Sequence, residues 1–156
     1  MFLYLIQHGE AKPEAEDPQR PLSDAGRQAV EKVARHAARA GVRPQVILHS
    51  GKLRAQQTAE IMARHLKTAR GPDAHSGLNP NDDPASAAEL ARHGEADTML
   101  VGHLPHLSRL ASLLLVNNAD TQPVRFQMGG IVCLERESPG SRWLLRWMLT
   151  PEIAGE

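Results

Sequence analysis

The sequence predicts an α/β fold, a three-layer sandwich in which helices flank a largely parallel central sheet. Short apolar runs at residues 2–7, 45–49 and 97–102 alternate with longer segments of helical periodicity, the pattern of a parallel sheet. The last third instead carries strand-like runs separated by turn residues, which indicates antiparallel strands at the C-terminal end. A length of 156 residues without a linker suits a single domain over residues 1–156.

The first half of the chain contains two predicted helices. In the first, apolar side chains recur every three or four residues from Val30 to Ala38, and Gly41 suits the helix end. Proline and polar residues before it indicate a loop. The predicted elements here are a strand at 2–7, a loop at 12–20, a helix from Ser23 or Asp24 to about Ala40, a strand at 45–49 and a helix from about Lys52 to Leu66.

The second half begins with a segment rich in Gly, Pro, Asp and Asn, which is typical of a loop. Apolar runs resume near residue 97, and Gly129-Gly130 and Ser138-Pro139-Gly140 mark turns between the closing strands. The predicted elements are a mostly loop region at 67–83 with room for one short strand, helices at 86–93 and from 104 to about 116, a turn region at 117–122, and strands at 97–102, 123–128, 131–135 and 142–149.

Composition excludes several classes of function. Lys plus Arg and Asp plus Glu each number 18, so neither a nucleic acid nor a membrane surface is an expected partner. Aromatic residues make up only 3%, which disfavours stacking on bases or sugars. The one cysteine, Cys133, is expected to be a buried apolar residue, and the absence of a possible intramolecular disulfide fits a reducing compartment. With no visible targeting or membrane-spanning segment, a cytoplasmic protein is expected.

Polar side chains follow three of the predicted strands. Gln7-His8-Gly9 ends the first, His49-Ser50-Gly51 with Arg54 ends the second, and Gly102-His103-Leu104-Pro105 ends the third. Ligands of open α/β sheets bind beyond the carboxyl ends of the strands, so His8, Arg54 and His103 are expected to face one crevice. Two imidazoles and a guanidinium, helped by a helix N-terminus, suit a phosphoryl group.

With these motifs in their order, the chain resembles the histidine phosphatase superfamily, with its phosphoglycerate-mutase-like fold, and most of all its small SixA-like phosphohistidine phosphatases. The compact length favours that branch over the mutases. The resemblance covers most of the chain and rests on Gln7-His8-Gly9 for the family's RHG, residues 20–26 (RPLSDAG) for RPLT…G, residues 50–58 (SGKLRAQQT) for SP..RA.QT, and residues 101–105 (VGHLP) for V.GH.P.

The resemblance implies that His8 is a nucleophile that forms a phosphohistidine intermediate. Arg54 would clamp the phosphoryl oxygens, and His103 would donate a hydrogen bond to them. The implied substrate is a histidine-phosphorylated protein, such as a phosphotransfer domain in signal transduction, with inorganic phosphate as product and without a metal or cofactor. The implied phosphate-binding residues are Gln7, Gly9, Ser50, Arg54 and His103.

Gln7 departs from the family pattern, which has an arginine before the nucleophile. A neutral amide in place of a charged donor is expected to slow the reaction by roughly ten-fold. Arg20 or Lys52 could supply the lost charge, or both could be solvated surface residues. Gly51 replaces a proline, and Ser50 could bond the site imidazole or cap the helix that follows.

A general acid for the leaving group is the second open point. The candidates are Glu10, Asp82 and Asp83, although each is better explained as a solvated loop carboxylate. Lack of a dedicated acid favours an N–P bond, because imidazole leaves more readily than an alkoxide. The pair His103 and His106 has metal-ligand spacing, but no neighbouring Cys or acidic pair completes a metal site, and none is predicted.

Two alternative functions remain open. The first is a phosphatase for a small phosphomonoester, which differs from the leading prediction in its leaving group. The second is a catalytically impaired module that binds phosphate or phosphohistidine, because of Gln7.

Overall fold

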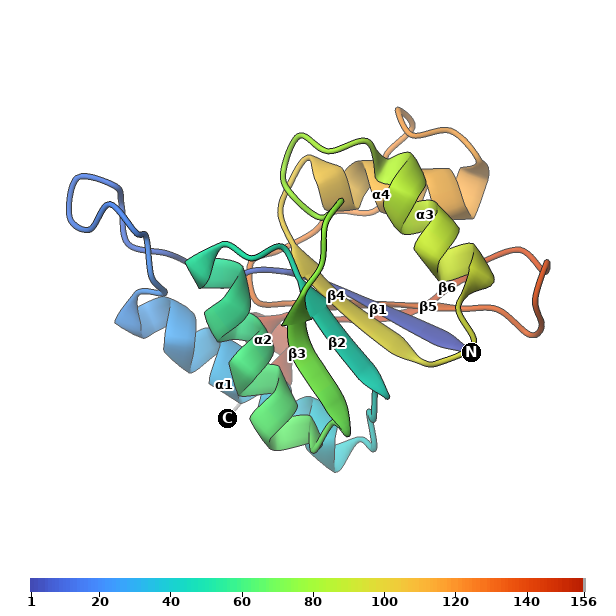
Figure 1. Cartoon of the computed structure of the whole chain (residues 1–156). Helices are drawn as coiled ribbons and strands as arrows, with labels where there is room; N and C mark the ends of the chain where they lie inside the picture. Colours follow the sequence, from blue (N-terminus) through green and yellow to red (C-terminus); the bar gives the residue numbers. More distant parts are fainter. Residues whose placement is uncertain (156) are drawn as a thin grey trace.

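The structure is a computed structural model and describes residues 1–155. Its six strands form one mixed sheet in the order β3-β2-β4-β1-β5-β6, with helices on both faces (Figure 1). The ladders among β3, β2, β4 and β1 are parallel, and those joining β1 to β5 and β5 to β6 are antiparallel. The predicted three-layer α/β sandwich with antiparallel C-terminal strands is therefore confirmed.

The elements follow the sequence prediction closely. The strands are β1 (Phe2–Gln7), β2 (Val46–His49), β3 (Arg70–Ala74), β4 (Thr98–Gly102), β5 (Ile131–Glu135) and β6 (Leu144–Leu149), and the helices are α1 (Asp24–Arg39), α2 (Leu53–Leu66), α3 (Pro84–His93), α4 (His106–Val116) and α5 (Pro151–Ala154). None of these helices within residues 1–155 has the length and apolar character needed to cross a membrane.

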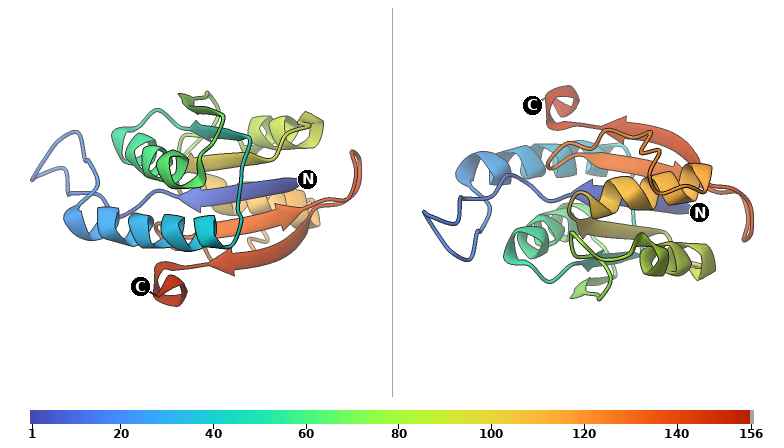
Figure 2. Two further views of the ribbon diagram at one scale, coloured as in Figure 1. Left: turned by 90° about the horizontal axis from the view of Figure 1, so that it is seen from below. Right: turned by 90° about the horizontal axis from the view of Figure 1, so that it is seen from above.

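The core consists of two apolar clusters, one on each face of the sheet. Side chains of β1 alternate between them: Tyr4 and Ile6 pack with α1 and α2, whereas Leu3 and Leu5 pack with α3 and α4. The two further views show these helix pairs on opposite sides of the sheet (Figure 2). Burial of β1 on both faces explains why its sequence is continuously apolar instead of alternating.

The predicted strand at residues 123–128 is wrong, because the structure has no strand there. Val124 and Phe126 are buried against the cluster beneath α4, and this alternation imitates the period of a strand. The segment packs on the face of the sheet that carries α3 and α4, not along an edge, so it joins no ladder. The short helix α5 was not predicted, and Cys133 is fully buried as expected.

Two helix starts differ slightly from the prediction. α3 begins at Pro84, where the Asp83 side chain accepts a hydrogen bond from the Ala85 amide, and proline suits the first helical position. α4 begins at His106, with Pro105 as its N-cap. His103 therefore lies in the connection between β4 and α4, not on the helix.

Candidate active site

The three polar strand ends lie side by side, because β4 runs between β1 and β2 and parallel to both. Gln7 lies opposite Gly102 in the β1–β4 ladder, and His49 lies opposite Val101 in the β2–β4 ladder. The backbone amide of His8 donates to the Gly102 carbonyl at 3.0 Å. The backbone therefore places the carboxyl ends of β1, β4 and β2 next to one another, where the crevice is predicted.

The His8 imidazole is oriented by its neighbour in the chain. Its Nδ1 lies 2.7 Å from the Gly9 carbonyl oxygen, and a carbonyl can only accept, so Nδ1 is the donor. Burial lowers the pKa of His8; the Gly9 hydrogen bond opposes this shift, and the charges of Arg54 and Arg20 add to it. A neutral ring with its proton on Nδ1 leaves the lone pair on Nε2, the form needed for nucleophilic attack.

The second imidazole, His103, is only 2% exposed, and its ring centroid lies 5.0 Å from that of His8. Its Nε2 is 2.6 Å from the Ser50 hydroxyl, and its Nδ1 is buried without a partner. Burial lowers the pKa of His103 to about 3, with further contributions from His8, Arg54, Lys52 and His106. His103 is therefore neutral near pH 7.

Ser50 contacts the site imidazole, which answers the choice left open by the sequence. The same hydroxyl accepts a hydrogen bond from the Lys52 amide at 3.3 Å, and Lys52 is itself the N-cap residue of α2. Ser50 therefore joins the loop after β2 to His103 and does not serve as the helix cap. Gly51, with φ of +93°, adopts the left-handed conformation that lets this loop turn.

Arg54 lies in the first turn of α2 and provides an unpaired cation. Its Nε is buried without a hydrogen-bond partner, and no carboxylate within residues 1–155 forms an ion pair with it. Burial lowers the pKa of Arg54, and the charge of Arg20 adds to this shift, but the group stays protonated at neutral pH. A partly buried guanidinium without an ion pair, beside two imidazoles, suits an oxyanion.

Thr58 ties the nucleophile loop to the helix that carries Arg54. Its buried hydroxyl accepts from the Gly9 amide at 3.0 Å and donates to the Arg54 carbonyl at 2.8 Å. Sequence reasoning quoted Thr58 only as part of a motif and assigned it no role. The available signal was its position four residues after Arg54, on the same face of α2.

The loop after His8 also rests closely on the start of α1. A Cβ added to Gly26 would lie 2.1 Å from the Glu10 carbonyl oxygen, so only glycine permits this approach. Ser23 caps α1 through the Gly26 amide, and its hydroxyl donates to the Glu10 carboxylate at 2.7 Å. Glu10 is therefore held at the start of α1.

The remaining predicted residues border the site. Arg20 adopts φ of +50°, and its Nε donates to the Lys12 carbonyl at 3.1 Å. The charge of Arg20 contributes to lowering the pKa of both His8 and Arg54, whereas the charge of Lys52 contributes to lowering the pKa of His103. The Gln7 carbonyl accepts from the Gly129 amide at 2.8 Å.

The other acid candidates have structural partners. Asp82 accepts a hydrogen bond from the Asn79 amide at 2.9 Å, and Asp83 caps α3. Their charges act on His106, which is fully buried, with both ring nitrogens unpartnered. No group of three His, Cys, Asp or Glu side chains within the described part of the chain could hold a metal ion.

Comparisons with known proteins agree with this geometry. The family model of the histidine phosphatase superfamily (branch 1) matches residues 3–79. An uncharacterised protein of Picosynechococcus sp. is 36% identical over 121 residues, which cover 73% of each chain. A SixA protein of Agrobacterium tumefaciens, provisionally assigned as a phosphohistidine phosphatase, is 28% identical, with a TM-score of 0.76 over 96% of this chain and 97% of that one.

The protein histidine phosphatase SixA, solved with tungstate, has the same fold, with a TM-score of 0.85 over 97% of both chains at 23% identity. Strand order, site and comparisons together define a phosphatase fold of the phosphoglycerate-mutase-like type. The chain belongs to the histidine phosphatase superfamily. Members of this superfamily are phosphatases, which are hydrolases.

Proposed function

We propose that the chain is a protein phosphohistidine phosphatase, which hydrolyses N-phosphohistidine through a phosphorylated His8. The observation that carries the proposal is the His8 ring, whose Nδ1 donates to the Gly9 carbonyl and whose lowered pKa keeps Nε2 unprotonated. Arg54 and His103 lie beside it and favour a phosphoryl group at Nε2.

In the first step the Nε2 lone pair of His8 attacks phosphorus, and the P–N bond of the substrate breaks. A substrate imidazole protonated on its other ring nitrogen leaves as neutral histidine, so this step needs no general acid from the protein. Water then attacks the phosphorus on His8, which releases inorganic phosphate and restores the neutral ring. Arg54 stabilises the charge on the phosphoryl oxygens in both steps.

Each candidate acid accepts a hydrogen bond from a neighbouring residue, which supports a substrate with an N–P bond. Glu10 is held by Ser23, Asp82 by the Asn79 amide, and Asp83 by the start of α3. A phosphomonoester has an alkoxide leaving group and needs a proton donor at that oxygen. A phosphohistidine, as carried by a phosphotransfer domain, therefore suits the site better than an alkyl phosphate.

The test is incubation of the purified chain with a histidine-phosphorylated phosphotransfer domain while phosphate release is followed. Release that His8→Ala abolishes is the expected result. A higher kcat/KM for p-nitrophenyl phosphate than for the phosphoprotein would favour the second candidate, a small-molecule phosphatase. That candidate draws support from the fold of an alpha-ribazole phosphatase of Shigella flexneri, which has a TM-score of 0.73 at 17% identity over 97% of both chains.

The third candidate, a module that binds phosphate or phosphohistidine without turnover, rests on Gln7. It predicts that the phosphoprotein binds but keeps its phosphate. Arg20→Ala and Lys52→Ala test whether either cation supplies the missing charge: a loss of turnover identifies the residue, and unchanged turnover in both excludes compensation.

A further inference from the structure

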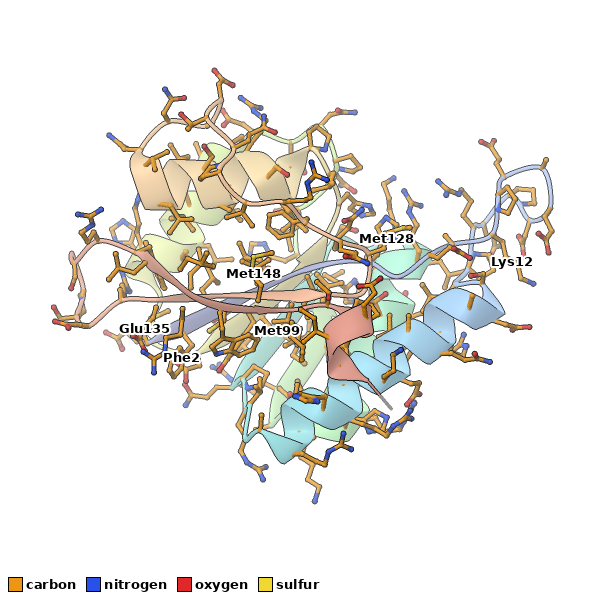
Figure 3. All side chains as sticks on the ribbon, turned by 180° about the vertical axis from the view of Figure 1, so that it is seen from behind. Phe2, Lys12, Met99, Met128, Glu135 and Met148 are labelled. Atoms are coloured by element: carbon orange, nitrogen blue, oxygen red, sulfur yellow. The ribbon has the colours of Figure 1, made fainter. Side chains whose placement is uncertain are left out.

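A second cation-rich cavity lies at the other end of the sheet. It has a volume of about 410 Å³ and is bordered by the segment between β5 and β6, the end of α3 and Leu114 of α4. Phe2 and Glu135 lie at this end, whereas Lys12, in the loop after His8, lies at the far end (Figure 3). The six residues of β1 place the cavity roughly 20 Å from His8.

The charges that line the cavity are positive. Arg92, Arg136 and Arg142 line it together with His93, and the lining residues include no Asp or Glu. Glu89 pairs with Arg92 and His93 at the rim, at 3.6 and 2.9 Å. Of the three guanidinium groups, only that of Arg92 pairs with a carboxylate within residues 1–155, which leaves an excess of positive charge.

Two acidic residues lie beyond Arg136, but outside this cavity. Glu95 and Glu137 border a separate depression of about 220 Å³, which Arg136 also lines. Neither forms an ion pair with Arg136 within residues 1–155. The positive charge of Arg136 is therefore unmatched by an anionic side chain in contact with it.

Arg136 is the centre of the cluster and is only 3% exposed. Its Nη1 donates to the Arg92 carbonyl at 2.7 Å and its Nη2 to the Gly94 carbonyl at 2.8 Å, which satisfies the end of α3. This capping explains why the guanidinium is buried, but it leaves Nε without a partner.

A second buried donor lies beside the first. Trp143 is 3% exposed, its ring centroid is 4.9 Å from the Arg136 guanidinium carbon, and its indole Nε1 has no partner. These unmet N–H groups and the Arg136 charge leave positive potential beside the cavity that no protein acceptor compensates, which favours an anion there. The side chains that carry these two donors line the same cavity.

We propose that this cavity binds a small organic anion through a phosphate or carboxylate group. The exposed guanidinium of Arg142 would donate hydrogen bonds to the group at the rim, and the buried charge of Arg136, beside Trp143, would attract it. A volume of about 410 Å³ lies within the range of small-molecule sites, so a compact body fits beside the charged group and against Leu114. This proposal does not depend on the reaction at His8.

The test follows the indole N–H resonance of Trp143 by NMR during titration with inorganic phosphate and, separately, with citrate. The chain has two tryptophans, and Trp143→Phe identifies the resonance. Titrations are repeated in Arg54→Ala, which weakens anion binding near His8. We expect the resonance to shift in both backgrounds and the apparent Kd to rise by about tenfold in Arg142→Gln. Arg70→Gln, on the exposed edge strand β3, is the matched control with no expected change.

A response to phosphate alone, to citrate alone or to both supports the site and identifies the charged group that it selects. The proposal is overturned if neither anion moves the Trp143 resonance. It is equally overturned if the shift is lost in Arg54→Ala, or if Arg142→Gln and Arg70→Gln give the same affinity as the parent chain.

Discussion

Each end of the sheet holds a guanidinium near other cations, but Arg54 at one end is partly buried and Arg136 at the other is buried, and the two have different partners. At the carboxyl ends of β1, β4 and β2, Arg54 keeps a buried donor free, and its charge helps to keep His8 and His103 neutral. At the opposite end, Arg136 uses two donors on the carbonyls that end α3. We infer that Arg54 at the first end binds the phosphoryl group of a substrate, whereas Arg136 at the second end supports the fold and contributes only its charge to the proposed anion site.

The largest expected effect is that of His8→Ala at the first end. Loss of the nucleophile should lower turnover by at least about 10³-fold, because the variant removes the ring nitrogen that is proposed to attack phosphorus. The melting temperature should stay within a few degrees, since the backbone bond from His8 to Gly102 is kept. Phosphate release and thermal unfolding of the same preparation measure both. Retained turnover would assign the chemistry to another residue.

Arg54→Ala should lower turnover by about 10²- to 10³-fold, because it removes a charged donor to the phosphoryl oxygens. Stability should be little changed, since the variant removes a partly buried cation whose Nε has no hydrogen-bond partner and keeps the carbonyl that Thr58 contacts. Chemical denaturation of the variant and the parent chain measures the free energy of unfolding, and phosphate release by the same preparations measures turnover. A destabilisation above about 2 kcal/mol would show that Arg54 also supports the fold.

Arg136→Met should show the opposite behaviour in stability. It removes two hydrogen bonds to the carbonyls of Arg92 and Gly94, so we expect a loss of about 1–3 kcal/mol in the free energy of unfolding. Arg142→Met is the matched control at the exposed rim, expected within about 0.5 kcal/mol of the parent. Equal effects from the two substitutions would contradict the assignment of Arg136 as the cap of α3.

Gln7→Arg should raise turnover by about tenfold, if the family arginine is simply missing here. Gln7→Lys, which adds charge without the planar fork, should recover only part of that gain. Steady-state kinetics on the same phosphoprotein compare the three proteins. A fall in turnover for Gln7→Arg would instead indicate a site adapted to a neutral residue at this position.

The smallest expected effect is a shift in pH dependence. Attack requires neutral His8, so kcat/KM should fall as the pH drops through its lowered pKa, with a midpoint below 6.5. Arg20→Ala removes one of the charges that lower the pKa of His8 and should move the midpoint to higher pH. Lys52→Ala is the control, because the charge of Lys52 acts on His103 and not on His8. Identical profiles for Arg20→Ala and the parent would rule out this coupling.

Local sequence patterns were enough to predict most of the elements. The β1 and α1 predictions hold because a doubly buried strand is a continuous apolar run and an amphipathic helix has a clear apolar periodicity, and Ser23 caps the helix as expected. Residues 123–128 misled the same reasoning, since Val124 and Phe126 alternate in burial without a strand partner. A hydrogen-bond ladder depends on which edge of the sheet is free, and that is not a local property.

The sequence by itself determined the fold class and the residues that gather at the carboxyl ends of β1, β4 and β2. In a parallel sheet the loops after neighbouring strands must converge, so motifs adjacent to those strands predict a site. Only the tertiary structure decided the bond between Ser50 and His103, the link from Gly9 through Thr58 to Arg54, and the cluster of Arg92, Arg136 and Trp143. These contacts join segments far apart in the chain, and their distances depend on how helices pack across the sheet, which no local pattern specifies.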